Sequence, residues 1–277
     1  MVPFKRVKSY QDVNIEHNEM LGMIYLKSSN KIAINDCLQI KLFDISFNHL
    51  QTLNNFDTHG CLCSDNNDRI LIENFPKGKI FIFDSNLNYA SEFPHLESHE
   101  PSAMQVDVDS TPNILYASYS SRNKISAYNI ETGKCENCID IDSPRELEIS
   151  QEHIYALSLT GYDKKRNNGG FKKLKFGSNC IFLLHKAELR LIKKIELPNW
   201  LCPNGLALDK YSNLITTAFQ VNNNSFVSNN RFIFVFDSSG QLLHKNEIEG
   251  IQYGNLLITS DKLINWTSQV IKMVNFF

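Results

Sequence analysis

Apolar and polar residues alternate with a period of two along most of the chain. Three segments align without gaps on this pattern: EPSAMQVD (100–107), SPRELEIS (143–150) and CPNGLALD (202–209). Each has a proline, two free positions, an apolar residue, a free position, an apolar residue, and then Asp or Ser. Alternation of this period is typical of a strand with one buried face. The three segments therefore predict equivalent strands of a repeated unit.

The repeat extends through the whole chain. Weaker copies lie at 18–24, 58–64 and 253–259, and the proline-equivalent positions follow one another at 40, 43, 43, 59 and 50 residues. A propeller blade of four short strands takes about 40–45 residues. The two long intervals contain visible insertions, at 160–179 and 219–230. Further short strands follow each copy, so the unit is predicted to have four strands, a to d in chain order.

The number of strands predicts a closed ring. The sixth unit begins near Tyr253 and has room for three strands before Phe277, while PFKRVKSY (3–10) offers a fourth. Completing the last blade with the opposite end of the chain leaves no free sheet edge there. We therefore predict an all-β, six-bladed β-propeller closed by an N-terminal strand, with residues 1–277 forming one domain. Seven blades would need about 40 residues each and no insertions, and the two insertions contradict this.

Composition narrows the function classes. The chain has 28 basic and 30 acidic residues, a formal net charge of -2, which argues against a globally basic nucleic-acid binder. With 42% hydrophobic residues it can bury a sizeable core. No apolar run reaches membrane-spanning length, and residues 1–14 lack the apolar stretch of a secretory signal. Seven cysteines, an odd number, then favour reduced thiols and a cytoplasmic protein with no membrane partner.

Several polar pairs have a structural interpretation. Cys135 and Cys138 have the spacing of half a zinc site, but a structural zinc needs four ligands and no second pair follows. We expect them to begin a strand after a turn, and Cys61 and Cys63 to pack on one face of another strand. The paired acids are expected in a–b hairpin turns, where Asp is frequent. They are Asp65, Asp68, Asp107 and Asp109.

Two stretches carry a family resemblance. The pattern P-x-G-L-A-L-D…L-I-T-T-A…R-F-I-F-V-F-D-S-S-G-Q in 203–241, and G-K-I-F-I-F-D-S-N-L in 78–87, resemble the NHL repeat. The resemblance covers essentially the whole chain. It implies a propeller like the one that ends tripartite-motif ubiquitin ligases, where it binds RNA or protein. No RING or B-box array precedes it here, so ligase activity would need residues outside this chain. Asp84, Asp237 and Gly240 are expected to shape its turns.

A second resemblance gives an alternative. The segment from Pro203 to Leu206 is similar to the N-G-L segment of gluconolactonase/regucalcin-like enzymes, six-bladed hydrolases that hold a divalent metal at the channel mouth. This implies Asn204 and Glu19 as metal ligands. The rest of the pattern departs from the family. Tyr253 and Gly254 stand where an acidic ligand is expected, and Arg145 occupies the equivalent position of another blade, where it would repel a cation.

The insertions indicate a binding face. Both join strands b and c of adjacent blades, so they lie on the same face of the ring as the d–a turns. The first insertion interleaves basic residues with Tyr162, Phe171 and Phe176, and the second contains Phe226. Basic residues neutralise phosphates and aromatic rings stack on bases. A solvated hairpin with no partner is the alternative interpretation.

The channel rim lies on this same face. By alignment it includes His59, Ser102, Arg145, Glu146, Asn204 and Asn255. Trp200 is beside it, either as a partner contact or packed between blades four and five. Arg145 is a candidate partner contact, and a rim ion pair with Glu146 that contributes little stability is the alternative interpretation.

The sequence thus predicts a non-catalytic recognition platform for a protein or single-stranded RNA, with the metal-dependent hydrolase as the alternative. We expect no metal, no cofactor and no catalytic residue. The candidate binding residues are Lys164, Lys165, Arg166, Phe171, Lys172, Lys173, Lys175, Trp200, Phe226, Arg145, Asn204 and His59.

Overall fold

The computed structural model covers the chain, and most of it is described below. The description leaves out residues 1–9, 14, 16–19, 37–38, 55–59, 75–78, 94–95, 97–100, 108–112, 159–161, 165–170, 174–178, 199–200, 223–224, 248–254, 260–261, 268–269 and 276–277. For residues 10–11, 162–164, 171–173, 221–222, 225–230 and 274–275 only the backbone is described.

Six four-stranded antiparallel sheets make up the fold, as predicted. The first blade contains β2 (Met20–Leu26), β3 (Lys31–Asp36), β4 (Gln39–Asp44) and β5 (His49–Asn54). The second contains β6 (Leu62–Ser64), β7 (Ile70–Asn74), β8 (Lys79–Phe83) and β9 (Tyr89–Phe93). The third contains β10 (Ala103–Asp107), β11 (Ile114–Tyr119), β12 (Lys124–Asn129) and β13 (Cys135–Asp140).

The remaining blades follow the same order. The fourth contains β14 (Pro144–Ile149), β15 (His153–Ser158), β18 (Cys180–His185) and β19 (Arg190–Glu196). The fifth contains β20 (Leu201–Leu208), β21 (Leu214–Asn222), β22 (Ser225–Phe236) and β23 (Leu242–Glu247). The sixth contains β24 (Asn255–Ile258), β25 (Lys262–Trp266), β26 (Ile271–Asn275) and β1 (Tyr10–Val13).

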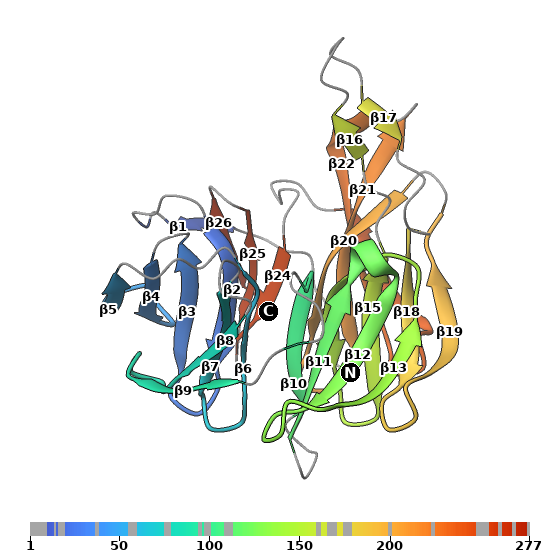
Figure 1. Cartoon of the computed structure of the whole chain (residues 1–277). Helices are drawn as coiled ribbons and strands as arrows, with labels where there is room; N and C mark the ends of the chain where they lie inside the picture. The colour runs from blue at the N-terminus through green and yellow to red at the C-terminus, as the bar shows by residue number, and fades with distance from the viewer. Residues whose placement is uncertain are drawn as a thin grey trace.

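The blades close into a six-bladed ring. Each innermost strand contacts the innermost strand of the next blade, in the order β2, β6, β10, β14, β20 and β24, and β24 contacts β2 (Figure 1). Strand β1 pairs with β26 from Tyr10 opposite Val274 to Val13 opposite Ile271. The predicted closure by an N-terminal strand is confirmed, but the described strand is 10–13 rather than 3–10. Val13 packs into the core there, which fixes this position.

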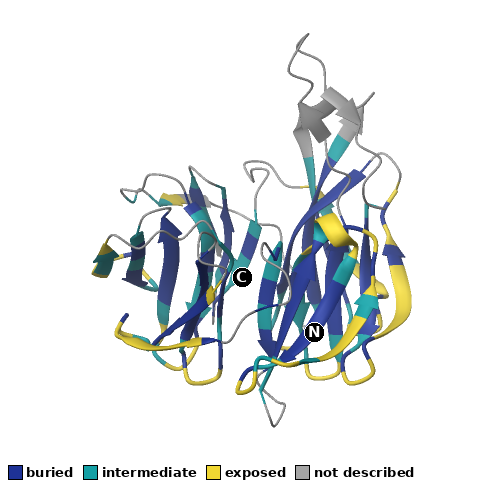
Figure 2. Ribbon diagram, in the orientation of Figure 1, coloured by how far each residue is buried: buried dark blue, intermediate teal, exposed yellow. Residues whose placement is uncertain are grey.

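The hydrophobic core is divided among the interfaces between blades. Six clusters of buried residues each join two neighbouring blades. Between blades four and five, for example, Leu157 and Leu183 pack with Leu206 and Phe234. The middle strands are buried on both faces, whereas outer strands such as β19 and β9 are exposed (Figure 2). Runs such as CIFLL are continuously apolar because both neighbours of the sheet need an apolar surface.

The turns that open on Asp share one hydrogen-bond pattern. Asp84 Oδ1 accepts the backbone N–H of Asn86 at 2.8 Å and of Asn88 at 2.9 Å. Asp237 Oδ1 accepts the backbone N–H of Ser239 and Gln241, both at 2.9 Å. Gly240 has φ of 75°, and an added Cβ would lie 2.7 Å from Ile195 Cδ1 of the neighbouring blade. The turn roles predicted for Asp84, Asp237 and Gly240 are confirmed.

These turns predict an acid-dependent loss of stability. The side chain and backbone of Asn88 donate to Asp84 and hold its pKa below the ordinary value. A carboxyl whose pKa is lower in the folded state stabilises above its unfolded pKa, and this contribution disappears as the pH falls through the folded pKa. We expect Asp84→Asn to cost about 0.5–1 kcal/mol at neutral pH and little below about pH 2. Urea unfolding across this range measures it, with exposed Glu131→Gln as the control. A cost that does not change with pH would contradict the assignment.

Both insertions extend the propeller on one side. The first contains a separate two-stranded sheet, β16 (Tyr162–Lys164) with β17 (Phe171–Lys173), between β15 and β18. The second insertion, 219–230, joins strands b and c as predicted, and both strands are longer than expected. Strands β21 and β22 continue through it, with Val221 opposite Phe226 and Asn222 opposite Ser225. The alternation of apolar and polar residues in FQVN allows the ladder to continue.

Helix is scarce in the part of the chain described here. It contains the 3-10 helix η2 (Ser120–Arg122), and none of its helices is long and apolar enough to cross a membrane.

Candidate functional site

The two hairpins project from the same end of the ring. Strands β16 and β17 and the far ends of β21 and β22 all lie above the propeller body (Figure 1). The predicted b–c position of both insertions is therefore confirmed. Lys164, Phe171, Lys172 and Lys173 lie on the first hairpin and Phe226 on the second. Lys165, Arg166 and Lys175 lie outside the described residues.

The register of the first hairpin groups two kinds of residue. Tyr162 is opposite Lys173, and Lys164 is opposite Phe171. Cross-strand partners and residues two apart occupy the same side of a sheet. Two aromatic and two basic positions therefore share one side of the hairpin, and Lys172 shares the other side with Asp163.

Positive charge is concentrated in the blade that carries this hairpin. Residues 144–197 include eleven Lys and Arg against six Asp and Glu, a net charge of +5 in a chain of net charge -2. Six of the basic residues and one acidic residue lie in the insertion at 160–179, which accounts for the whole +5. Exposed Arg190, Lys193 and Lys194 of the outer strand β19 are among the others. Lys194 Nζ lies 5.3 Å from the centre of the Phe182 ring, and Arg190 pairs with exposed Glu188 at 2.9 Å. The blade that carries the hairpin therefore also has exposed basic residues on its outer strand.

A central channel of about 830 Å³ passes between the six innermost strands. Of the predicted rim residues, Ser102, Arg145, Glu146, Asn204 and Asn255 line it. Arg145 is exposed, as expected for a rim position. Asn204 lines the channel as a residue that is only 3% exposed, and its binding role stays a prediction. His59 and Trp200 lie outside the described residues.

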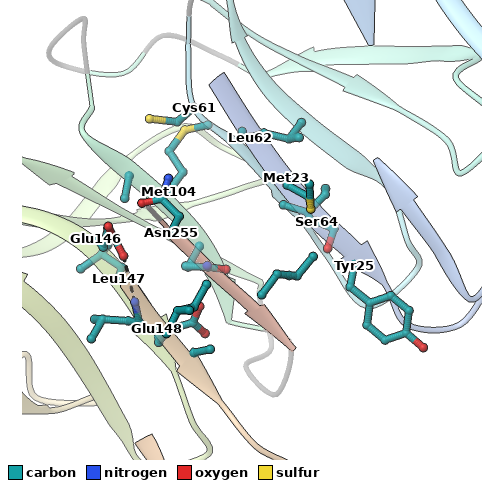
Figure 3. A pocket seen from close by; sticks show the side chains of 18 of the residues that line it. Met23, Tyr25, Cys61, Leu62, Ser64, Met104, Glu146, Leu147, Glu148 and Asn255 are labelled. Carbon is teal, nitrogen blue, oxygen red and sulfur yellow. Dashed lines mark hydrogen bonds between the residues drawn. The ribbon is translucent and has the colours of Figure 1, made fainter. Parts of the chain in front are cut away.

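The alternative of an ion pair between Arg145 and Glu146 is wrong. Glu146 Oε2 instead accepts the backbone N–H of Leu206 from blade five, at 2.9 Å (Figure 3). Both strands carry a β-bulge here, which leaves Arg145 out of the β14 pairing and Gly205 out of the β20 pairing. Both Arg145 and Glu146 line the channel, but Glu146 has its hydrogen-bond donor in the next blade rather than in Arg145. Glu146 therefore ties two blades together inside the channel.

Sequence reasoning missed a second channel carboxylate. Glu148 lies two residues after Glu146 on β14, and both side chains face the channel (Figure 3). Burial raises the pKa of Glu146 to about 7 and, together with the charge of Glu146, raises the pKa of Glu148 to about 8. Lys27 acts in the opposite direction on Glu148. The alternation of Glu and apolar residues in PRELEI was the available signal, since it assigns the two glutamates to one face.

The polar pairs follow the structural interpretation with one exception. Asp65 pairs with Arg69 at 2.6 Å, and Asp68 accepts the backbone N–H of Ser28 at 3.1 Å. Asp107 was expected in a turn, and this is wrong. It ends β10 as a buried residue and pairs with Lys186 of blade four at 2.8 Å, because the blade interface places a lysine opposite it. Asp109 lies outside the described residues.

The thiols and candidate metal ligands can be placed as follows. Cys135 begins β13, and Cys61 and Cys63 contact one hydrophobic cluster, as predicted. The described cysteines are free thiols. Glu19, proposed as a metal ligand with Asn204, lies outside the described residues. Within the described part of the chain, no three His, Cys, Asp or Glu side chains group in a way that could hold a metal ion.

Comparison with known proteins supports the fold. No family model matches this chain, and no curated protein matches it. Among solved structures it is similar to a gluconolactonase from Xanthomonas campestris, with 12% identity, a TM-score of 0.64, and 95% of this chain and 87% of that one covered. It is also similar to U3-55K, with 10% identity, a TM-score of 0.62, and 96% and 98% covered. Streptogramin B lyase matches with 12% identity, a TM-score of 0.60, and 97% and 98% covered. At these identities the similarity shows the β-propeller fold alone.

Proposed function

We propose that this protein is a non-catalytic recognition platform of the NHL type, and that it binds single-stranded RNA on the face that carries the two hairpins. The observation that carries the proposal is the side of the β16–β17 hairpin on which Tyr162, Lys164, Phe171 and Lys173 share positions. Alternating basic and aromatic positions match a chain in which phosphates alternate with bases.

The charge of the insertion supports the same partner. The insertion at 160–179 has six basic residues and one acidic residue, and exposed Arg190, Lys193 and Lys194 lie on the outer strand of the same blade. Lysines there would neutralise phosphates and release counterions, which supplies most of the affinity of sequence-independent binding. An acidic protein surface would use the same charges but would have no bases to stack on the aromatic rings.

The test is binding of a random single-stranded RNA pool, measured by fluorescence anisotropy at several salt concentrations. The variant Lys164→Ala/Lys172→Ala/Lys173→Ala should bind about tenfold or more weakly at low salt. The slope of log affinity against log salt should become shallower by about 1.4, since Lys164 and Lys173 share the side with the aromatic positions and each lost phosphate contact removes about 0.7. Its folding is checked by circular dichroism.

A matched control removes three lysines from the opposite side of the ring. Lys27, Lys134 and Lys210 are exposed residues in a–b or c–d turns. Alanine at these positions should leave affinity and slope unchanged. Equal losses of RNA affinity in the two triple variants would show that the hairpin is not the binding site. Absence of RNA binding at low salt would overturn the proposal and leave an acidic protein as the candidate partner.

A further inference from the structure

The central channel is large enough for a ligand of its own. Its volume of about 830 Å³ is within the range of small-molecule sites. Its wall combines polar groups with apolar side chains, among them Met23, Leu62 and Met104. In Figure 3, Glu146 and Glu148 lie to one side of the space, and Met23 and Leu62 lie across it.

The two glutamates differ in the hydrogen bonds that they accept from the protein. Glu146 accepts the backbone N–H of Leu206 at 2.9 Å, so its carboxylate has a fixed position. Glu148 has no hydrogen bond or ion pair within the described residues, although it faces the same space. Two carboxyl groups two residues apart on one strand face disfavour simultaneous ionisation unless a cation lies between them.

The other charged groups of the channel form no ion pair with these two glutamates within the described residues. From the remaining strands and turns the wall includes Lys27, Asp65, Asp68 and Arg145, with Tyr25 and Cys61 as further titratable groups. Asp65 has its partner in Arg69, and Asp68 has backbone N–H donors. Arg145 and Lys27 are exposed and form no ion pair with either glutamate within the described residues, although the charge of Arg145 acts on Glu146 and the charge of Lys27 acts on Glu148.

A second buried group of the channel wall also has no partner. Trp266, at the interface of blades six and one, is 6% exposed and lines the same channel. Its indole Nε1 has no hydrogen-bond partner among the described residues. Buried polar groups in folded proteins are almost always bonded. A donor without an acceptor and a carboxyl without a donor therefore lie along one cavity.

We propose that the central channel binds a small organic cation, with an ammonium or guanidinium group placed between Glu146 and Glu148. The apolar residues across the channel would contact the carbon chain of the ligand. A hydrogen-bond acceptor on the ligand could also satisfy the indole of Trp266. This site is separate from the hairpin surface and is independent of RNA binding.

Binding should be coupled to proton release. Burial holds both glutamates partly protonated near neutral pH. A bound cation favours the ionised forms, so the two sites lose protons when it binds. Affinity should therefore rise as the pH increases through about 7 to 8 and level off above that range. Below it both groups are neutral and the attraction is lost.

The experiment is calorimetric titration with agmatine, which carries an ammonium and a guanidinium group, at about pH 6 and about pH 9. Neutral n-butanol is the comparison ligand. Agmatine should bind at least tenfold more tightly at the higher pH, and buffers of different ionisation enthalpy should reveal proton release at intermediate pH. Butanol should show neither effect.

The decisive variant is Glu148→Gln, because it breaks no bond between blades. It should weaken agmatine binding about tenfold or more and leave only the pH dependence near 7 that Glu146 supplies. Glu152→Gln removes an exposed glutamate from the same blade and should change neither. RNA binding should be the same in both variants. No agmatine binding at about 10 mM, or equal binding by the two variants, would overturn the proposal.

Discussion

Replacing Lys186 by methionine should lower the free energy of unfolding by about 3–5 kcal/mol. Lys186 of blade four donates from Nζ to Asp107 Oδ1 of blade three at 2.8 Å, and the two residues are only 9% and 3% exposed. Methionine keeps the apolar stem but removes the cation, so Asp107 keeps a buried charge that has lost its counter-charge. Urea unfolding followed by circular dichroism measures the loss.

The control is an exposed ion pair of the same blade. Arg190 and Glu188 lie 2.9 Å apart with side chains 62% and 57% exposed. Arg190→Met should therefore cost less than about 1 kcal/mol. The double variant Lys186→Met/Asp107→Asn should recover part of the loss, since it removes the uncompensated charge. Equal costs for Lys186→Met and Arg190→Met would refute a stabilising role for the buried pair.

Deleting residues 1–13 should lower the melting temperature by about 10 °C or more. The deletion removes β1, the outer strand of blade six, and exposes the edge of β26. It also removes Val13 from the cluster that joins blades six and one. An exposed strand edge pairs readily with another chain, so light scattering should reveal self-association of the truncated protein.

Adding the missing segment back distinguishes strand pairing from a general effect of truncation. A synthetic peptide of residues 1–15 should raise the melting temperature of the truncated protein and suppress its self-association. A scrambled peptide of the same composition should do neither. An unchanged melting temperature after deletion would mean that β1 does not hold the ring closed.

The sequence allowed the architecture to be predicted because each blade repeats a local pattern. Alternation in segments such as CPNGLALD depends on burial of one face, and the repeat spacing set the number of blades at six. Burial on both sides explains continuously apolar runs such as CIFLL. The N-terminal strand was displaced because its pairing with β26 is decided by contacts such as Val13, far from β26 in sequence.

The channel was harder to predict because its contacts cross from blade to blade. Arg145 and Glu146 are neighbours in sequence, but Glu146 accepts a hydrogen bond from Leu206 of the next blade and forms no ion pair with the arginine. The sequence indicates a turn at Asp107, and only the structure shows its ion pair with Lys186 of another blade. Local patterns describe strands well, but they contain no information on which side chains meet across an interface.

The uneven distribution of charge gives the molecule an electric dipole. Residues 144–197 carry +5, so the other residues together carry -7. This field would orient the protein and an approaching polyanion before any contact forms, so that the polyanion meets blade four first. The effect acts on the rate of productive encounter rather than on the lifetime of the complex, and it extends only about 10 Å at 0.1 M salt. The negative remainder repels the same polyanion and so limits the orientations in which it can arrive.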